Sequence, residues 1–188
     1  MSDDSSTSEN SISLRGRLLL ASPGLSDGTF DHSVIMLDEH SAAEGAHGTI
    51  INHPTGTTVG ELLTDPDFAP LRDLPIHRGG PLSAAELTFS CFCMVDGNRL
   101  VYRANISAQT AADLISDGEH IVRATIGHSA WSPGQLENEL KRNTWITLNP
   151  SNELLAMEHD VSLWKNLLKS ISPYHHLLSQ APKNPFLN

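Results

Sequence analysis

The chain has 188 residues, of which 39% are hydrophobic and 18% charged, and its formal net charge is −10. This length and composition fit one soluble globular domain with a sizeable core and are short for two domains. The 12 Lys and Arg residues are scattered along the chain. Because strong direct nucleic-acid binding depends on clustered cations that displace counterions from phosphates, the sequence argues against that function.

The two ends of the chain differ from its middle. Residues 1–11, MSDDSSTSENS, have no large apolar side chain beyond the first methionine and are expected to be disordered. The apolar run after Arg15 and Arg17 is only LLLA, too short for a signal peptide or a membrane span, so the cytoplasm is the expected location. We expect one domain over residues 12–172 and a loose tail over 173–188.

Apolar and alternating segments predict strands, and amphipathic segments with capping residues predict helices. In chain order, strands are expected at residues 17–21, 33–39, 47–53, 75–79, 87–95, 100–106, 120–127 and 144–149, and helices at 57–65, 107–117, 132–143 and 160–171. Hairpin turns are expected at 41–46 and at the Asp-Gly of 95–98. Several hairpins with interspersed helices indicate an α+β fold with a mainly antiparallel, curled sheet.

Cys91 and Cys93 lie in a predicted strand, where alternation places both thiols on one face. A disulfide between such neighbours would be strained. Two buried, reduced thiols are the favoured interpretation, and a redox pair is the alternative.

The segment from Gly127 to Ser129 begins like the nucleophile elbow Gly-x-Ser-x-Gly of serine hydrolases. Trp131 occupies the place of the last glycine, and only 59 residues follow Ser129 (188 − 129). A serine hydrolase that uses Ser129 is therefore the alternative function and not the leading one.

The residues after it predict the start of a helix. Ser132 is a good N-cap, Pro133 suits the first helical position, and Gln135 completes a capping box. Trp131 and Leu136 have the spacing of a hydrophobic staple. This segment is thus interpreted as scaffold.

Among the ten histidines, His40 and His47 flank the same predicted hairpin, with Glu39 and Glu44 nearby. A zinc site needs a third protein ligand, which the pattern does not identify. Solvated hairpin histidines are favoured, and no metal and no cofactor is predicted.

The loop HRGGPL is the main candidate for ligand binding. Successive glycines at Gly79 and Gly80 let backbone N–H groups form an anion-binding concavity, and Arg78 adds charge. Asn52 and Gln135 complete the candidate ligand-binding set. The alternative is a tight turn after a strand, with Asn52 satisfying loop backbone.

The segments GRLLLASPGLSDGTFDHSVIMLDEH, GAHGTIINHPTG, HRGGPL, IGHSAWSPGQLENELKRNTW and DVSLW occur in one order. In this order they resemble the YqgE/AlgH family of bacterial proteins over about Arg15 to Ile171. The most specific matches are Phe30 with Ser33-Val34, Glu39-His40, Gly45 with Gly48, Asn52 with Pro54, Gly79-Gly80-Pro81, and Trp131 with Gly134-Gln135-Leu136-Glu137.

The resemblance implies an α+β fold whose bifurcated sheet curls into a pseudo-barrel with flanking helices. It implies a transcriptional-regulator role through a link to alginate control in some members, and it brings no catalytic residues. The chain departs from the family at His47, His53, His128 and Ser129, and its C-terminal tail lacks a Gly-containing ending.

Together these observations predict a non-enzymatic regulatory or binding protein. We expect a small anion or a protein partner near Asn52, Arg78, Gly79 and Gly80. Direct DNA binding is a third option that only the family label supports.

Overall fold

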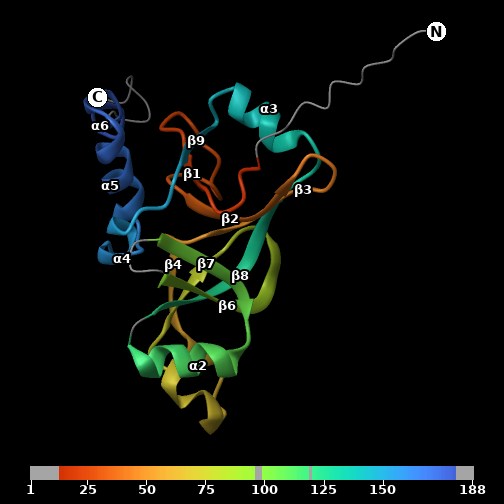
Figure 1. Ribbon diagram of the computed structural model, residues 1–188, viewed down its shortest axis with the longest axis vertical. Coiled ribbons are helices and arrows are strands. Elements are labelled where there is room, and N and C mark those ends of the chain that lie inside the picture. The colour runs from red at the N-terminus through yellow and green to blue at the C-terminus, as the bar shows by residue number, and fades with distance from the viewer. Residues whose placement is uncertain (1–12, 96–98, 119, 181–188) are drawn as a thin grey trace, which may run out of the picture.

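The structure, a computed structural model, describes residues 13–95, 99–118 and 120–180, and consists of one branched sheet with helices around it (Figure 1). The strands are β1 (Leu18–Ala21), β2 (Val34–Ser41), β3 (Gly45–Ile50), β4 (Pro54–Thr58), β5 (Pro75–Arg78), β6 (Leu82–Val95), β7 (Arg99–Ile106), β8 (Ile121–Trp131) and β9 (Trp145–Leu148). The helices are α1 (Val59–Leu62), the 3₁₀ helix η1 (Pro66–Leu71), α2 (Ala108–Asp117), α3 (Gln135–Lys141), α4 (Glu153–Ala156), α5 (Ser162–Ile171) and α6 (Pro173–Leu178).

Strand β8 joins the two halves of the sheet. Its last part pairs with β3, and its first part pairs with β5 on one side and β6 on the other. The strand order is β4-β5-β8-β3-β2-β1-β9, and β7 pairs with β6 outside this order. Among the described strands, only the β5–β8 pair is parallel. The predicted α+β fold with a mainly antiparallel, curled sheet is confirmed: it forms a half-barrel with an added strand pair.

Two groups of buried apolar side chains hold the helices against the sheet. The larger group lies between β1–β3 and α5, which buries Leu163, Trp164, Leu167 and Leu168. The smaller group lies between β5, β6 and β8 on one side and α2 with η1 on the other. Because each fully buried Leu stabilises the fold by about 1.5–3 kcal/mol, the apolar stripe of α5 explains why this helix docks.

Side chains near several helix ends make local capping contacts. Thr58 and Glu61 make a capping box at α1, and the Ser107 hydroxyl accepts a hydrogen bond from the Thr110 N–H at the start of α2. The side chain of Asp160 accepts from the Ser162 N–H ahead of α5. Asn143 ends the α3 segment with a left-handed φ of 56°. Such contacts favour these helix ends, although α1 (Val59–Leu62) is shorter than the helix expected at 57–65.

The start of α3 differs from the prediction by three residues. Gly134 has a φ of +77°, so the regular helix begins only at Gln135. The Gln135 side chain still accepts from the Ser132 N–H at 3.1 Å, as in a capping box. Trp131 and Leu136 are both buried in the larger core, consistent with the predicted staple.

Near α3, the carboxylate of Glu139 binds three side chains. Both indole N–H groups, of Trp131 at 2.8 Å and of Trp145 at 2.7 Å, donate to its Oε2, while the Gln135 amide donates to its Oε1 at 2.9 Å. We call Glu139 and these three partners the α3 corner. Its polar groups are satisfied, which makes it part of the scaffold.

Three further differences have physical causes. Strand β8 extends beyond its expected end at residue 127, because its last residues pair with β3. Ser129, for example, pairs with Gly48. Strand β4 was not predicted, since PTGTT lacks apolar alternation. Helix α6 occupies the start of the expected loose tail, because the Ser172 hydroxyl caps it and Pro173 suits its first turn.

The expected disordered segment, residues 1–11, and the end of the tail, 181–188, lie outside the described residues, as do residues 96–98 of the hairpin turn expected at 95–98. No helix in the described part of the chain is long and apolar enough to cross a membrane.

Candidate functional site

Asn52, the first of the predicted ligand-binding residues, is fully buried and works inside the scaffold. Its Oδ1 accepts the Val34 N–H at 2.8 Å, and its Nδ2 donates to the His32 carbonyl at 2.9 Å. Both ends of the amide are thus used to join the segment after β3 to the start of β2. This arrangement matches the structural alternative for Asn52.

Gly79 and Gly80 are required by the close approach of β8. A Cβ on Gly79 would lie 2.2 Å from the Gly127 carbonyl oxygen, and a Cβ on Gly80 would lie 2.2 Å from the His128 carbonyl oxygen. The Gly79 N–H donates to the Ile126 carbonyl. The Gly79 N–H, which was expected to face an anion, is therefore hydrogen-bonded within the sheet. Arg78, at the end of β5, is exposed.

Gln135 lies apart from the other four residues. Gly79 receives a backbone hydrogen bond from Ile50, at one end of β3, whereas Gly45, at the other end, packs on Trp131 and Ser132 next to α3. The six residues of β3 span about 20 Å. The structure brings Asn52, Arg78, Gly79 and Gly80 together and leaves Gln135 at the far end of the strand. Anion binding by the Arg78 loop stays a prediction.

Ser129, the alternative nucleophile, is buried within β8. Its side chain is inaccessible to solvent, and its hydroxyl donates to the Gly79 carbonyl at 3.2 Å. A nucleophilic serine gives its proton to a general base and lies open to substrate. Ser129 does neither, and it belongs to the packing between β5 and β8.

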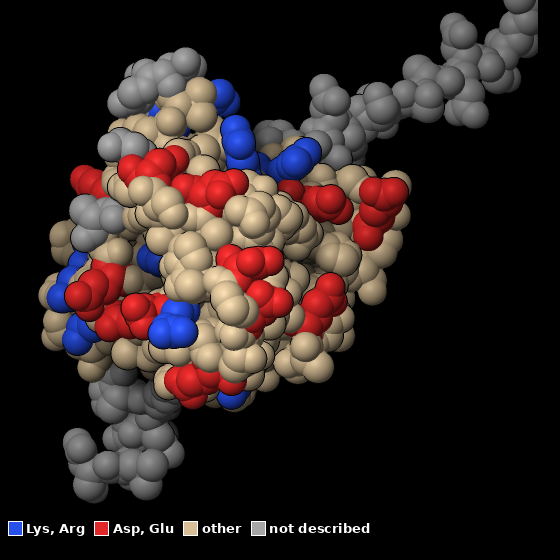
Figure 2. Space-filling model, turned by 90° about the horizontal axis from the view of Figure 1, so that it is seen from below, with Lys and Arg blue, Asp and Glu red and all other residues tan. Residues whose placement is uncertain are grey.

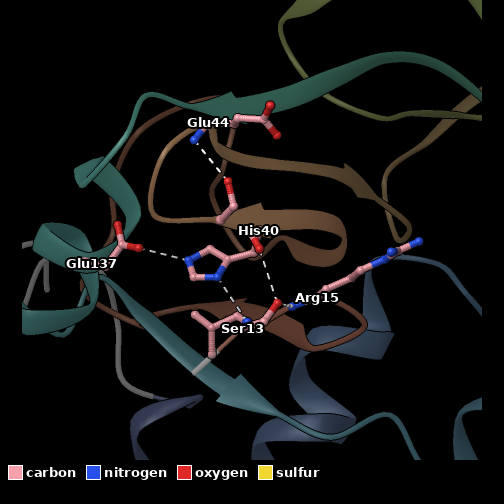
Figure 3. A network of polar contacts seen from close by, with 7 residues as sticks. Ser13, Arg15, His40, Glu44 and Glu137 are labelled. Carbon is pink, nitrogen blue, oxygen red and sulfur yellow. Dashed lines mark hydrogen bonds and ion pairs between the residues drawn. The ribbon is translucent and has the colours of Figure 1, made fainter. Parts of the chain in front are cut away.

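His40 links three parts of the chain. Its Nδ1 accepts the Leu14 N–H at 3.1 Å, which places the ring proton on Nε2, and Nε2 donates to Glu137 at 2.9 Å. Figure 3 shows the ring between α3 and the segment around Ser13. The prediction of a solvated histidine is wrong for His40, whose side chain is 3% exposed, while His47 is exposed. Both nitrogens of His40 are occupied, so the ring is unavailable to a metal.

Cys91 and Cys93 are both buried and unbridged. Burial raises the pKa of Cys91, which keeps the thiol protonated. Across the described ranges, no three His, Cys, Asp or Glu side chains converge as metal ligands would.

A second polar cluster lies where the segment before α5 meets the sheet. Arg123 donates to His159 at 2.9 Å, and His77 lies 2.8 Å from the His159 carbonyl. Burial is the main cause that lowers the pKa of Arg123 to about 10 and of His159 to about 4. Burial also lowers the pKa of His77, so both imidazoles are neutral near neutral pH and the charge of this cluster is that of Arg123.

A cleft of about 940 Å³ lies between β7 and strands β2, β3 and β8. We call it the β7 cleft. Its lining includes Asp38, His47, Thr49, Tyr102 and His128. None of the five predicted ligand-binding residues lines it.

Asp38 is the distinctive group of the β7 cleft. It sits at an irregularity in the β2–β3 ladder, between Leu37 and Glu39. Its Oδ2 receives one long hydrogen bond from Thr49, at 3.4 Å, and its Oδ1 is buried with no hydrogen-bond partner in the described structure. Burial raises the pKa of Asp38 to about 7, against the opposing effects of the Thr49 and Tyr102 hydroxyls beside it. The carboxyl therefore changes charge around neutral pH.

Aromatic and charged groups surround Asp38. Burial first and the Asp38 charge second raise the pKa of Tyr102, so its hydroxyl stays protonated and can donate. The rings of His47 and His128 stack with centroids 5.6 Å apart. The charged residues at the cleft are Arg15, Glu39, Glu86 and Arg103.

Asp38 and Tyr102 were not among the candidate residues predicted from the sequence. The available signal was an acid at the end of the buried run Val34–Leu37 and a tyrosine within the strand segment LVYRANI. Neither pattern shows that β7 faces β2 across a cleft, because that contact depends on how the sheet curls.

The model of the AlgH-like family, DUF179, matches residues 18–175. The chain belongs to this family. It is 31% identical over 190 residues to the UPF0301 protein BF2109 of Bacteroides fragilis, covering 96% of this chain and 94% of that protein. It is 31% identical over 187 residues to the UPF0301 protein CF0373 of Chlamydia felis, covering 93% and 95%.

Two solved structures of related fold support the architecture. The crystal structure of DIP2367 from Corynebacterium diphtheriae matches with a TM-score of 0.67 and 22% identity, over 88% of this chain and 91% of that one. The solution structure of AlgH from Pseudomonas aeruginosa matches with a TM-score of 0.63 and 24% identity, over 98% and 100%.

Several residues that carry the AlgH-like resemblance have structural tasks here. Asn52 joins β2 and β3, His40 binds Glu137, and Gly79 and Gly80 admit β8. These signature residues thus belong to the scaffold, whereas Glu39, another of them, lines the β7 cleft.

Proposed function

We propose that this protein is a non-enzymatic binding protein with a regulatory role, and that its ligand or partner enters the β7 cleft. The observation that carries the proposal is a cleft of about 940 Å³ whose wall includes Asp38, a carboxyl with a pKa of about 7 beside the hydroxyls of Thr49 and Tyr102. A pocket of this size, with a few polar groups and a titratable group of raised pKa in its wall, has the character of a binding site.

Two observations favour binding over the other functions. The Ser129 hydroxyl is buried and donates to a carbonyl, so a serine-hydrolase mechanism has no accessible nucleophile. Figure 2 shows acidic side chains spread over the end of the molecule that carries α2 and η1. The exposed acids of these helices and their neighbours are Glu61, Asp65, Asp67, Asp73, Asp113 and Asp117. This face repels nucleic-acid phosphates.

The test is a thermal-shift panel of small polar metabolites, amines and inorganic anions on three proteins: the parent, Asp38→Asn and Arg78→Ala. A ligand of the cleft raises the Tm of the parent and of Arg78→Ala, and raises that of Asp38→Asn less. Stabilisation that Arg78→Ala loses and Asp38→Asn keeps would move the site to the glycine loop. Equal stabilisation of all three proteins would contradict both locations.

A further inference from the structure

We propose that the β7 cleft receives an extended peptide segment that carries a basic side chain and adds to the free edge of β7 as a further strand. The inference rests on the proposed function, since both require an occupied cleft, and it names the class of the occupant.

The pairing of β7 leaves one of its edges open. Among the described strands, β7 pairs only with β6, so one of its edges has unpaired N–H and C=O groups. The consecutive residues 100–105 of β7 all border the cleft. Successive residues of a strand point to opposite faces, so an unbroken run borders one space when the edge of the strand faces it. An unpaired edge is a template for another strand.

The open edge of β7 and the cleft beside it have the size of a short extended peptide. The extended part of this edge ends at Asn105, whose φ of 52° is left-handed. The five residues 100–104 offer about 17 Å of edge at about 3.3 Å per residue. A cleft of about 940 Å³ accommodates a short extended segment beside them. In this mode of recognition, main-chain hydrogen bonds give affinity and side-chain contacts give specificity.

The charged residues at the cleft favour a peptide that carries a basic side chain. The carboxyl groups at the cleft are Asp38, Glu39 and Glu86, and the cations are Arg15 and Arg103. Both arginines are exposed, whereas Asp38 is partly buried beside the hydroxyls of Thr49 and Tyr102. An ammonium or guanidinium group beside Asp38 would supply a donor and favour its charged form. With a net charge of −10, the protein also attracts a basic partner at long range.

The experiment uses a fluorescein-labelled peptide, Thr-Val-Thr-Lys-Thr-Val-Thr with blocked ends, and fluorescence anisotropy with the full chain. Two analogues carry N-methyl groups on alternate amides, one on the even and one on the odd positions. N–H groups alternate sides along a strand, so only one analogue loses the hydrogen bonds to β7. A fourth peptide has Glu in place of Lys.

We expect the parent peptide to bind, one N-methylated analogue to bind at least tenfold more weakly, and the other to keep its affinity. The Glu peptide should bind at least tenfold more weakly to the parent protein, and Asp38→Asn should reduce that preference. Amide exchange in residues 100–104 should slow with the parent peptide. Circular dichroism checks that Asp38→Asn is folded.

Equal binding by both N-methylated analogues overturns strand addition, as does no binding by the parent peptide at 1 mM, roughly the weakest affinity of interest. A dimer that forms without peptide and protects residues 100–104 would assign the edge to a second copy of the chain. If the peptide fails while a metabolite stabilises the parent more than Asp38→Asn, the inference falls and the proposed function stands. Failure of both experiments overturns both.

Discussion

Glu139 at the α3 corner and Asp38 in the β7 cleft are both partly buried acids, but their surroundings differ. Glu139 accepts three hydrogen bonds of 2.7–2.9 Å. Asp38 accepts one of 3.4 Å and has an unpartnered oxygen, and burial raises its pKa to about 7. A satisfied acid stabilises the fold, whereas an unsatisfied one lowers stability when it ionises. The difference separates scaffold from candidate site in this chain.

The largest expected effect tests the scaffold at the β5–β8 crossing. In Gly80→Ala, the new Cβ would lie 2.2 Å from the His128 carbonyl oxygen, at a φ of +155°. We expect unfolding to become easier by at least ~3 kcal/mol, because backbone must move. Gly28→Ala is the matched control, since its Cβ meets nothing within 4 Å. Urea denaturation measures both, and equal stabilities would show that the crossing is loose.

The next effect tests the satisfied acid. Glu139→Ala leaves the indole N–H groups of Trp131 and Trp145 without their acceptor, and both rings are nearly buried, at 4% and 5% exposure. The expected loss of stability is about 2–3 kcal/mol, with a change in tryptophan fluorescence. Glu44→Ala, at an exposed position, should change stability by less than about 0.5 kcal/mol. Similar values for the two variants would remove Glu139 from the scaffold.

Replacing the unsatisfied acid, Asp38, should change stability in the opposite direction. The pKa of Asp38 is higher in the fold than in the unfolded chain, so the native state binds more protons between about pH 4 and 7. Its contribution to stability is therefore present below pH 4 and is lost as the pH rises to about 7. Above pH 7, Asp38→Asn should be more stable than the parent by about 2 kcal/mol, after allowance for partial exposure.

Urea titrations at pH 5 and pH 8 measure this difference, with Asp73→Asn, an exposed aspartate, as the control. A parent protein that gains stability from pH 5 to pH 8 relative to Asp38→Asn would show that Asp38 is partnered in solution.

The smallest effect concerns Ser129. Its hydroxyl makes a single hydrogen bond to the Gly79 carbonyl, so Ser129→Ala should cost about 1 kcal/mol of stability. A fluorophosphonate probe should label neither protein. Labelling of the parent that disappears in Ser129→Ala would establish the hydrolase and end the contrast between scaffold and cleft.

The sequence predicted the elements whose cause is local. Thr58, Ser107 and the apolar stripe of α5 act within a few residues. Helices α2 and α5 form close to the expected ranges, whereas α1 is shorter than the helix expected at 57–65. The α+β class followed from the number of hairpins and helices. The boundaries failed at β8 and α3, where the conformation of single glycines, Gly127 and Gly134, decides the path of the chain.

The candidate site was harder to predict, because its causes are long-range. Gly79 and Gly80 have the composition of an anion-binding loop, yet their lack of side chains is explained by the carbonyls of Gly127 and His128. Asp38 faces β7 only because the sheet curls and β6–β7 folds alongside it. The pattern of residues in a single sequence does not predict either of these contacts.

The branching of the sheet at β8 has a consequence for how the molecule comes apart. The 11 residues of this strand are shared among the ladders of β3, β5 and β6. If the two halves of the sheet separated, β8 would lose its hydrogen bonds to the strands of one half. Heating should therefore give one calorimetric peak, with equal van't Hoff and calorimetric enthalpies, although the buried apolar groups form two separate clusters.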